Sequence, residues 1–249
     1  MKDRIRKVWP AILVFVLVFC SLTGCGSKQE KPSDTVLWIN ATHAVLTESN
    51  GWDTSIFGGM EPSESNQKLE IQMLDEWWGV TDRQSAIDNM DWLINEGHRT
   101  DFADFMGMLK DEGAEEFTQD ELAEVLSAMM EDETEGSYLA KAFSDYLAYG
   151  EHAIDGWDYS RAMSLLGWYY IAGYYSEQEA LDQALELGKT IQSQFSSWDE
   201  FMESYFRGYE YWSYESSDAR REIYEELKAQ QDSPYSVAWD TPLENTWDK

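Results

Sequence analysis

Apolar residues recur at helical spacing along almost the whole chain from Val36 onward. Leu37, Ala41 and Val45 follow one another at intervals of four residues, which places them on one face of a helix. No segment shows the sustained two-residue alternation of a strand. We therefore predict an all-α protein, a single compact domain of about ten helices. The predicted helices span residues 36–49, 66–78, 82–96, 100–112, 119–132, 137–151, 155–174, 177–195, 198–213 and 217–231.

Several predicted helix starts carry a capping box. In this motif, a Ser or Thr and a Glu or Gln three residues later satisfy free backbone N–H groups, and an apolar run follows. The pairs are Thr81 with Gln84, Thr118 with Glu121, Ser176 with Glu179, and Ser197 with Glu200. These motifs strengthen the all-α prediction.

The N-terminal segment has a different pattern. It opens with the basic residues Lys2, Arg4, Arg6 and Lys7. A run of 13 residues from Val8 to Cys20, apolar apart from Pro10, follows, and this arrangement is typical of a secretion signal. A spanning helix needs about 20 apolar residues, so an uncleaved membrane anchor is disfavoured.

The leader closes with Leu22-Thr23-Gly24-Cys25. This tetrapeptide resembles a bacterial lipobox, in which a signal peptidase cuts before an acylated cysteine. We predict a lipoprotein signal peptide over residues 1–24, a lipidated Cys25 with a flexible tether over residues 25–35, and a helical domain over residues 36–249. The expected location is the extracytoplasmic face of the cell membrane.

Charge limits the partners. Cleavage after residue 24 removes four of the 18 basic and one of the 48 acidic residues, which leaves a formal charge of −33. Nucleic acid is excluded as a partner because phosphate binding needs positive charge. Anionic lipid also repels such a domain, so membrane attachment is expected through the lipid anchor, which needs at least two acyl chains to be stable.

The cysteine and aromatic content of the chain indicates how its core is stabilised. Cys20 and Cys25 are the two cysteines of the chain, so the mature fold is expected to have no disulfide. Its stability must then come from packing, and the chain supplies 12 Trp, 14 Tyr and 10 Phe. This aromatic content predicts an aromatic-rich helical core. The alternative is a ring-lined groove for sugar or peptide.

Three blocks of residues together resemble a known family. The first contains Trp78-Gly79-Val80-Thr81-Asp82-Arg83, Trp92-Leu93 and Glu96-Gly97-His98-Arg99; the second contains Trp157-Asp158, Arg161-Ala162, Gly167-Trp168-Tyr169 and Ala172-Gly173-Tyr174; the third contains Phe195-Ser196-Ser197-Trp198, Ser204-Tyr205, Gly208, Trp212, Ser233-Pro234-Tyr235 and Trp239. The pattern is similar to uncharacterised bacterial domains of the YbeU and YbeR type (DUF1266-like) and covers most of residues 36–240. Tyr235 replaces an expected Trp. The resemblance implies no activity, cofactor or substrate.

Polar residues inside these blocks are the candidate site. Gly97 follows a helical run and is suited to ending that helix, and a cation just beyond it would complement the helix dipole. Alternatively, Glu96, His98 and Arg99 could form an acid/base pair and an anion clamp. The full candidate cluster, either a binding site or a set of structural ion pairs, is Arg83, Glu96, His98, Arg99, Asp158, Arg161 and Arg207.

Metal binding is disfavoured. His152 has Glu151 beside it and Asp155 one turn later, but a zinc site needs three or four ligands, and neither a HExxH motif nor a cysteine pair is present. We therefore expect no metal and no other cofactor.

Two classes of function fit these observations. The first is a non-catalytic binding module that recognises a protein, peptide or glycan at the cell envelope. The second is an envelope hydrolase with Glu96 or Asp158 as general acid or base. An apolar groove would favour binding, whereas two carboxyl groups about 5–9.5 Å apart in a cleft would favour glycoside hydrolysis.

Overall fold

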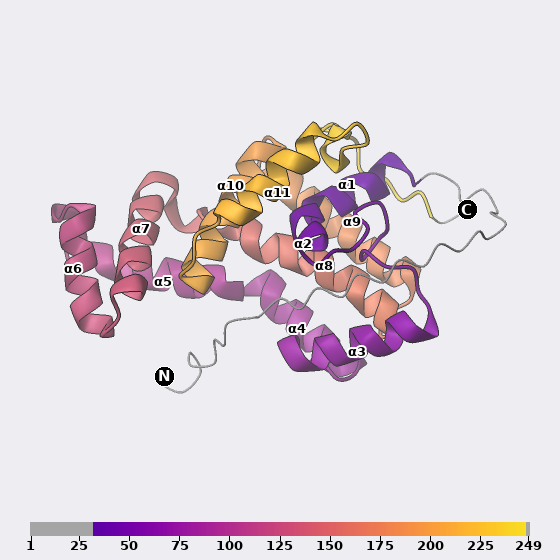
Figure 1. Cartoon of the computed structure of the whole chain (residues 1–249), viewed down its shortest axis with the longest axis horizontal. Coiled ribbons are helices and arrows are strands. Elements are labelled where there is room, and N and C mark those ends of the chain that lie inside the picture. Colours follow the sequence, from indigo (N-terminus) through magenta and orange to yellow (C-terminus); the bar gives the residue numbers. More distant parts are fainter. Residues whose placement is uncertain (1–31, 248–249) are drawn as a thin grey trace. The chain divides into compact units, whose positions relative to one another are not determined.

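The computed structural model describes residues 32–247, which contain helices and no strands (Figure 1). The α-helices are α1 (Asp34–Thr42), α2 (Ala44–Ser49), α3 (Glu64–Trp78), α4 (Arg83–Asn95), α5 (Gly97–Asp111), α6 (Gln119–Met130), α7 (Glu133–Tyr149), α8 (Asp155–Ala172), α9 (Glu177–Gln194), α10 (Trp198–Ser213) and α11 (Asp218–Ala229), with the short 3-10 helices η1 (Ala114–Glu116), η2 (Gly150–His152) and η3 (Pro234–Ser236). The all-α prediction is confirmed. Within the same residues, no helix combines the length and the apolar character that crossing a membrane requires.

The predicted first helix is two helices in the structure. The chain leaves helical geometry at His43, whose φ is −122°, so α1 ends at Thr42 and α2 begins at Ala44. Helix α1 also begins earlier than predicted, because the Ser33 hydroxyl accepts a hydrogen bond from the Val36 N–H at 3.3 Å. Its first residues therefore belong to the segment that we predicted as tether.

The N-caps follow the predicted motifs with one correction. Thr118, Ser176 and Ser197 each accept a hydrogen bond from the backbone N–H three residues later. The prediction for Thr81 is wrong, since Asp82 caps α4 in a reciprocal pair with Ser85. The Asp82 carboxylate accepts the Ser85 N–H at 2.8 Å, so the cap lies one residue later than predicted.

Helix α8 lies at the centre of the fold. Every residue from Asp155 to Ala172 is buried except Tyr170, because α3, α4, α9 and α10 all pack against it. A helix without a solvent-facing polar stripe needs cover on all sides. Its polar side chains must therefore find partners inside the protein.

Large rings fill the core, as the composition predicts. The indole rings of Trp38, Trp198 and Trp239 contact one another with centroids 4.8–5.3 Å apart. The Trp38 Nε1–H donates to the Trp239 carbonyl at 3.0 Å, and the Trp198 Nε1–H donates to the Val237 carbonyl at 2.9 Å. These contacts hold the irregular C-terminal segment against α1 and α10.

A second, smaller core lies between α5, α6 and α7. Its fully buried members include Phe102, Met106 and Leu126, with Phe143 and Ile154 beside them. Helices α6 and α7 run side by side in Figure 1, and they pack closely along their length.

Candidate functional site

The turn between α4 and α5 places the first site residues. Gly97 adopts the left-handed conformation, with a φ of +62°, which agrees with the prediction that it ends a helix. Helix α5 begins at Gly97 itself and not near residue 100 as predicted. An added Cβ at Gly97 would lie 2.3 Å from the Asp158 Oδ2 atom. Glycine is therefore needed both for the backbone conformation and for the close approach of Asp158.

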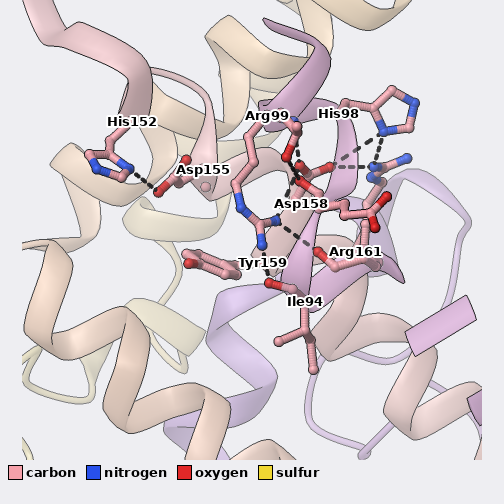
Figure 2. A network of polar contacts seen from close by, with 12 residues as sticks. Ile94, His98, Arg99, His152, Asp155, Asp158, Tyr159 and Arg161 are labelled. Atoms are coloured by element: carbon pink, nitrogen blue, oxygen red, sulfur yellow. Dashed lines mark hydrogen bonds and ion pairs between the residues drawn. The ribbon is translucent and has the colours of Figure 1, made fainter. Parts of the chain in front are cut away.

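Asp158 on α8 is the centre of the cluster and is 0% exposed. Its Oδ1 accepts a hydrogen bond from Arg161 Nη2 at 2.6 Å, and its Oδ2 accepts one from the Arg99 backbone N–H at 2.9 Å. Arg99 Nη1 lies 3.4 Å from Oδ2, and His98 Nδ1 lies 3.5 Å from Oδ1. Figure 2 shows these three side chains converging on Asp158.

Arg161 is almost as buried as its carboxylate partner, with 7% of the side chain exposed. Its guanidinium carbon lies 4.6 Å from the Trp157 ring centroid and 5.4 Å from that of Trp78. Arg161 Nη2 also donates to His98 Nδ1 at 2.8 Å. Cation-π contacts and a paired carboxylate together offset part of the cost of burying this charge.

Arg99 closes the end of α4. Its Nη1 donates to the Leu93 carbonyl at 2.7 Å and its Nη2 donates to the Ile94 carbonyl, while its guanidinium lies over the Tyr159 ring at 5.0 Å. Free carbonyls at a helix C-terminus attract cations. The contacts of Arg99 thus match the capping interpretation of this residue.

Burial and charge act in opposite directions on the ionisation of this cluster. Burial opposes ionisation of Asp158, but contacts with His98, Arg161 and the Arg99 backbone outweigh burial and lower its pKa. Burial lowers the pKa of His98, which the nearby Asp158 carboxylate partly offsets. Asp158 is therefore a carboxylate at neutral pH, held by internal partners and closed to solvent.

The other three candidates lie elsewhere. Glu96 is exposed, and its side chain makes no capping hydrogen bond. Arg83 pairs with Glu179 on α9 and donates to the Tyr174 carbonyl at 2.7 Å. Arg207 on α10 donates from Nε to the Ala153 carbonyl at 2.9 Å. The structure thus brings together four of the seven candidates, namely His98, Arg99, Asp158 and Arg161.

Arg207 instead lines an open cleft of about 620 Å³, here called the Arg207 cleft. The cleft lies between the end of α7, η2, the start of α8, the end of α9 and the segment of α10 up to Arg207. Its lining residues are Tyr149, His152, Ala153, Asp155, Gln194, Phe195, Asp199, Glu200, Glu203 and Arg207. The sequence pattern does not indicate this cleft, because its walls come from α7, η2, α8, α9 and α10, which are brought together only by the fold.

His152 and Asp155 form one edge of the Arg207 cleft. His152 Nδ1 lies 3.0 Å from Asp155 Oδ2, and the two side chains are 78% and 2% exposed. Figure 2 shows the His152 ring facing the Asp155 carboxylate. The three-residue spacing of His152 and Asp155 is visible in the sequence, but it does not by itself indicate a cleft. In residues 32–247, no group of three His, Cys, Asp or Glu side chains is arranged to hold a metal ion.

Fold and site together define a class of protein: an all-helical domain with a closed ionic cluster at its centre and a separate open cleft. The chain belongs to the family described as Protein of unknown function (DUF1266), whose model matches residues 73–239. The match confirms the predicted resemblance to DUF1266 domains over most of residues 36–240. Neither a curated protein nor a solved structure matches the chain.

Proposed function

We propose that this protein is a lipid-anchored lipoprotein of the extracytoplasmic membrane face, and that its helical domain is a non-catalytic binding module whose ligand site is the Arg207 cleft. The ligand belongs to the envelope, as a protein, peptide or glycan. One observation carries the assignment of the site. The ionic cluster around Asp158 is filled by internal partners, whereas the Arg207 cleft is open and has a volume typical of ligand sites.

The same geometry argues against hydrolysis by the two carboxylates considered from the sequence. A general acid or base must reach the proton that it transfers. Asp158 is 0% exposed and paired with arginines, and Glu96 is exposed outside the Arg207 cleft. These two groups therefore do not face a shared substrate, which favours the binding function.

The anchor rests on the leader sequence alone, since residues 1–31 and Cys25 with them lie outside the described residues. Three features of the leader support acylation: its basic residues, the 13-residue run from Val8 to Cys20, and the tetrapeptide that ends at Cys25. Helices α1–α11 offer no spanning segment, so in this proposal attachment depends on acylation.

Lipidation at Cys25 is the first testable prediction. Cells that express the full chain and are fed an alkyne fatty acid should incorporate the label into the wild type and not into Cys25→Ala, because the acylated thiol is then missing. The measurement is in-gel fluorescence after click coupling, with membrane fractionation beside it. A labelled Cys25→Ala variant, or an unlabelled wild type in the soluble fraction, would contradict the anchor.

The binding site is tested by photo-crosslinking in cells. p-Benzoylphenylalanine placed at His152, which is 78% exposed on the edge of the Arg207 cleft, is expected to give a covalent adduct after irradiation, because a bound ligand lies within reach. The matched control is the same photoprobe at Trp77, which is 67% exposed on α3 and lies outside the cleft lining. Mass spectrometry identifies adducts. Equal labelling at both positions, or none at His152, would refute the cleft as a ligand site.

A further inference from the structure

The charges of the Arg207 cleft are not all available to a ligand. Asp199 accepts hydrogen bonds from Lys228 Nζ at 2.7 Å and from the Tyr224 hydroxyl at 2.8 Å. Glu203 accepts from both terminal nitrogens of Arg221. A basic side chain of α11 thus neutralises each of these two carboxylates. Among the described residues, Asp155 and Glu200 are the cleft carboxylates without a Lys or Arg partner within 4.0 Å, and Arg207 has no carboxylate within that distance.

Arg207 keeps free donors in a fixed position. Its Nε–H donates to the Ala153 carbonyl at 2.9 Å, and its guanidinium carbon lies 4.0 Å from the Tyr149 ring centroid. Its two Nη atoms make no hydrogen bond, and no carboxylate lies within 4.0 Å of them, in the part of the chain that the structure describes. A guanidinium held in this way presents two parallel N–H donors, which match the two oxygens of a carboxylate.

The opposite charge comes from Asp155 and Glu200. Asp155 is 2% exposed; its Oδ2 contacts His152, and its Oδ1 has no hydrogen-bond partner among the described residues. Glu200 uses Oε2 for the backbone N–H and hydroxyl of Ser196. A buried carboxylate oxygen without a donor carries an uncompensated desolvation cost. A ligand donor in the cleft would remove that cost.

We propose that the Arg207 cleft recognises a zwitterion of the amino-acid or short-peptide class, with its carboxylate on the Arg207 Nη atoms and its ammonium group toward Asp155 and Glu200. The proposal rests on the proposed function. An anion without an ammonium group meets the repulsion of two carboxylates, and a cation without a carboxylate leaves Arg207 unused. Tyr149 and Phe195 supply aromatic walls for the apolar part of the ligand.

The test is isothermal titration calorimetry on the full chain, purified in mild detergent, with three probes that share one dipeptide backbone and differ in their terminal groups. L-Alanyl-L-alanine carries both charges, N-acetyl-L-alanyl-L-alanine lacks the ammonium, and L-alanyl-L-alaninamide lacks the carboxylate. We expect the zwitterionic dipeptide to bind at least about tenfold more tightly than either blocked form, since each charged group contributes a charge-assisted hydrogen bond. Equal affinity for all three probes, or no heat with the dipeptide at millimolar concentration, would overturn the proposal.

Variants of the cleft show which residue contacts the carboxylate of the ligand and which contacts its ammonium group. Arg207→Lys keeps the positive charge and removes the paired donors, so it should weaken the two carboxylate-bearing probes about tenfold and leave the amide probe unchanged. Glu200→Gln should weaken the two ammonium-bearing probes and spare the acetylated one. The matched control is Arg83→Lys, which lies outside the cleft lining and should change nothing. If only Arg207→Lys fails to fold, the Glu200→Gln pattern still decides the proposal.

The two experiments distinguish failure of the zwitterion specificity from failure of the binding function. Photo-adducts at His152 together with no preference among the three dipeptide probes would leave the binding function standing and refute the zwitterion. Absence of adducts at His152 would remove the binding function itself, whatever the calorimetry gives.

Discussion

Replacing Arg161 with alanine is expected to lower the free energy of unfolding by about 3–5 kcal/mol. The side chain is 7% exposed and donates to the fully buried Asp158. Its removal leaves part of the charge on Asp158 uncompensated and opens a space between Trp78 and Trp157, which now contact the guanidinium. For a domain of this size the loss corresponds to a fall in Tm of roughly 6–20 °C.

Urea denaturation of the full chain followed by circular dichroism measures this loss. The matched control is Arg83→Ala, because Arg83 also pairs with a carboxylate, but its side chain is 52% exposed. Removal of an exposed pair costs about 1 kcal/mol or less. In addition, the double variant Asp158→Asn with Arg161→Met should recover part of the loss, since it removes both buried charges and keeps an acceptor for the Arg99 N–H. A loss for Arg161→Ala as small as that for Arg83→Ala would refute the structural role and make this cluster the next candidate for a ligand.

Glu70→Gln is expected to stabilise the protein above neutral pH. Glu70 lies on α3 and is 0% exposed, and both of its carboxyl oxygens lack a hydrogen-bond partner among the described residues. Burial raises its pKa from 4.5 to about 8. The unfolded chain releases this proton at lower pH than the folded chain, so the free energy of unfolding falls as pH rises from 4.5 through 8.

His43 has the opposite pH dependence. It is buried, and burial lowers its pKa from 6.5 to about 4, against a smaller opposing effect of its own backbone. As pH falls, the unfolded chain takes up this proton near pH 6.5, whereas the folded chain takes it up only near pH 4. The free energy of unfolding therefore rises with pH between 4 and 6.5. The two groups therefore offset each other between pH 4.5 and 6.5. Between pH 6.5 and 8 only Glu70 acts, and over this interval it lowers the free energy of unfolding by about 2 kcal/mol.

Denaturation of the wild type and Glu70→Gln at pH 4.0, 6.0 and 8.5 tests this window. The two proteins should be similar at pH 4.0, where Glu70 is protonated in both the folded and the unfolded chain, and should diverge as pH rises above 4.5 toward 8. Glu76→Gln, an exposed change on the same helix, should follow the wild type at every pH. Parallel curves for wild type and Glu70→Gln would show that Glu70 does not titrate as a buried group.

Most of the fold could be predicted from the sequence because local signals determine it. Side-chain caps at Thr118, Ser176 and Ser197 act within one turn and need no tertiary information. The break at His43 could not be read in this way, because the apolar pattern continues through it from α1 into α2. Tertiary packing decides such a break, and periodicity alone does not report it.

In the candidate site, too, local spacing predicts some residue roles, whereas others depend on tertiary packing. Asp158 and Arg161 lie three residues apart on one helix, and Arg99 follows a helix end, so their structural roles were readable from spacing. Arg207 shares no such local relation with them, and its position beside Asp155 depends on how α10 packs against α8. The burial of Glu70 could not be predicted from the sequence either, since a carboxylate in a helix normally faces solvent.

The contacts between α1 and the C-terminal segment bear on when the protein can finish folding. Ser33 and Thr246 hydroxyls are 2.7 Å apart, the Glu244 N–H donates to the Thr35 hydroxyl, and the Trp38 indole donates to a carbonyl 201 residues later. Closing so long a loop is slow and comes late. Trp38 therefore stays uncovered while the ribosome makes the intervening residues. A polypeptide in this state cannot complete its core until the C-terminal segment has been made.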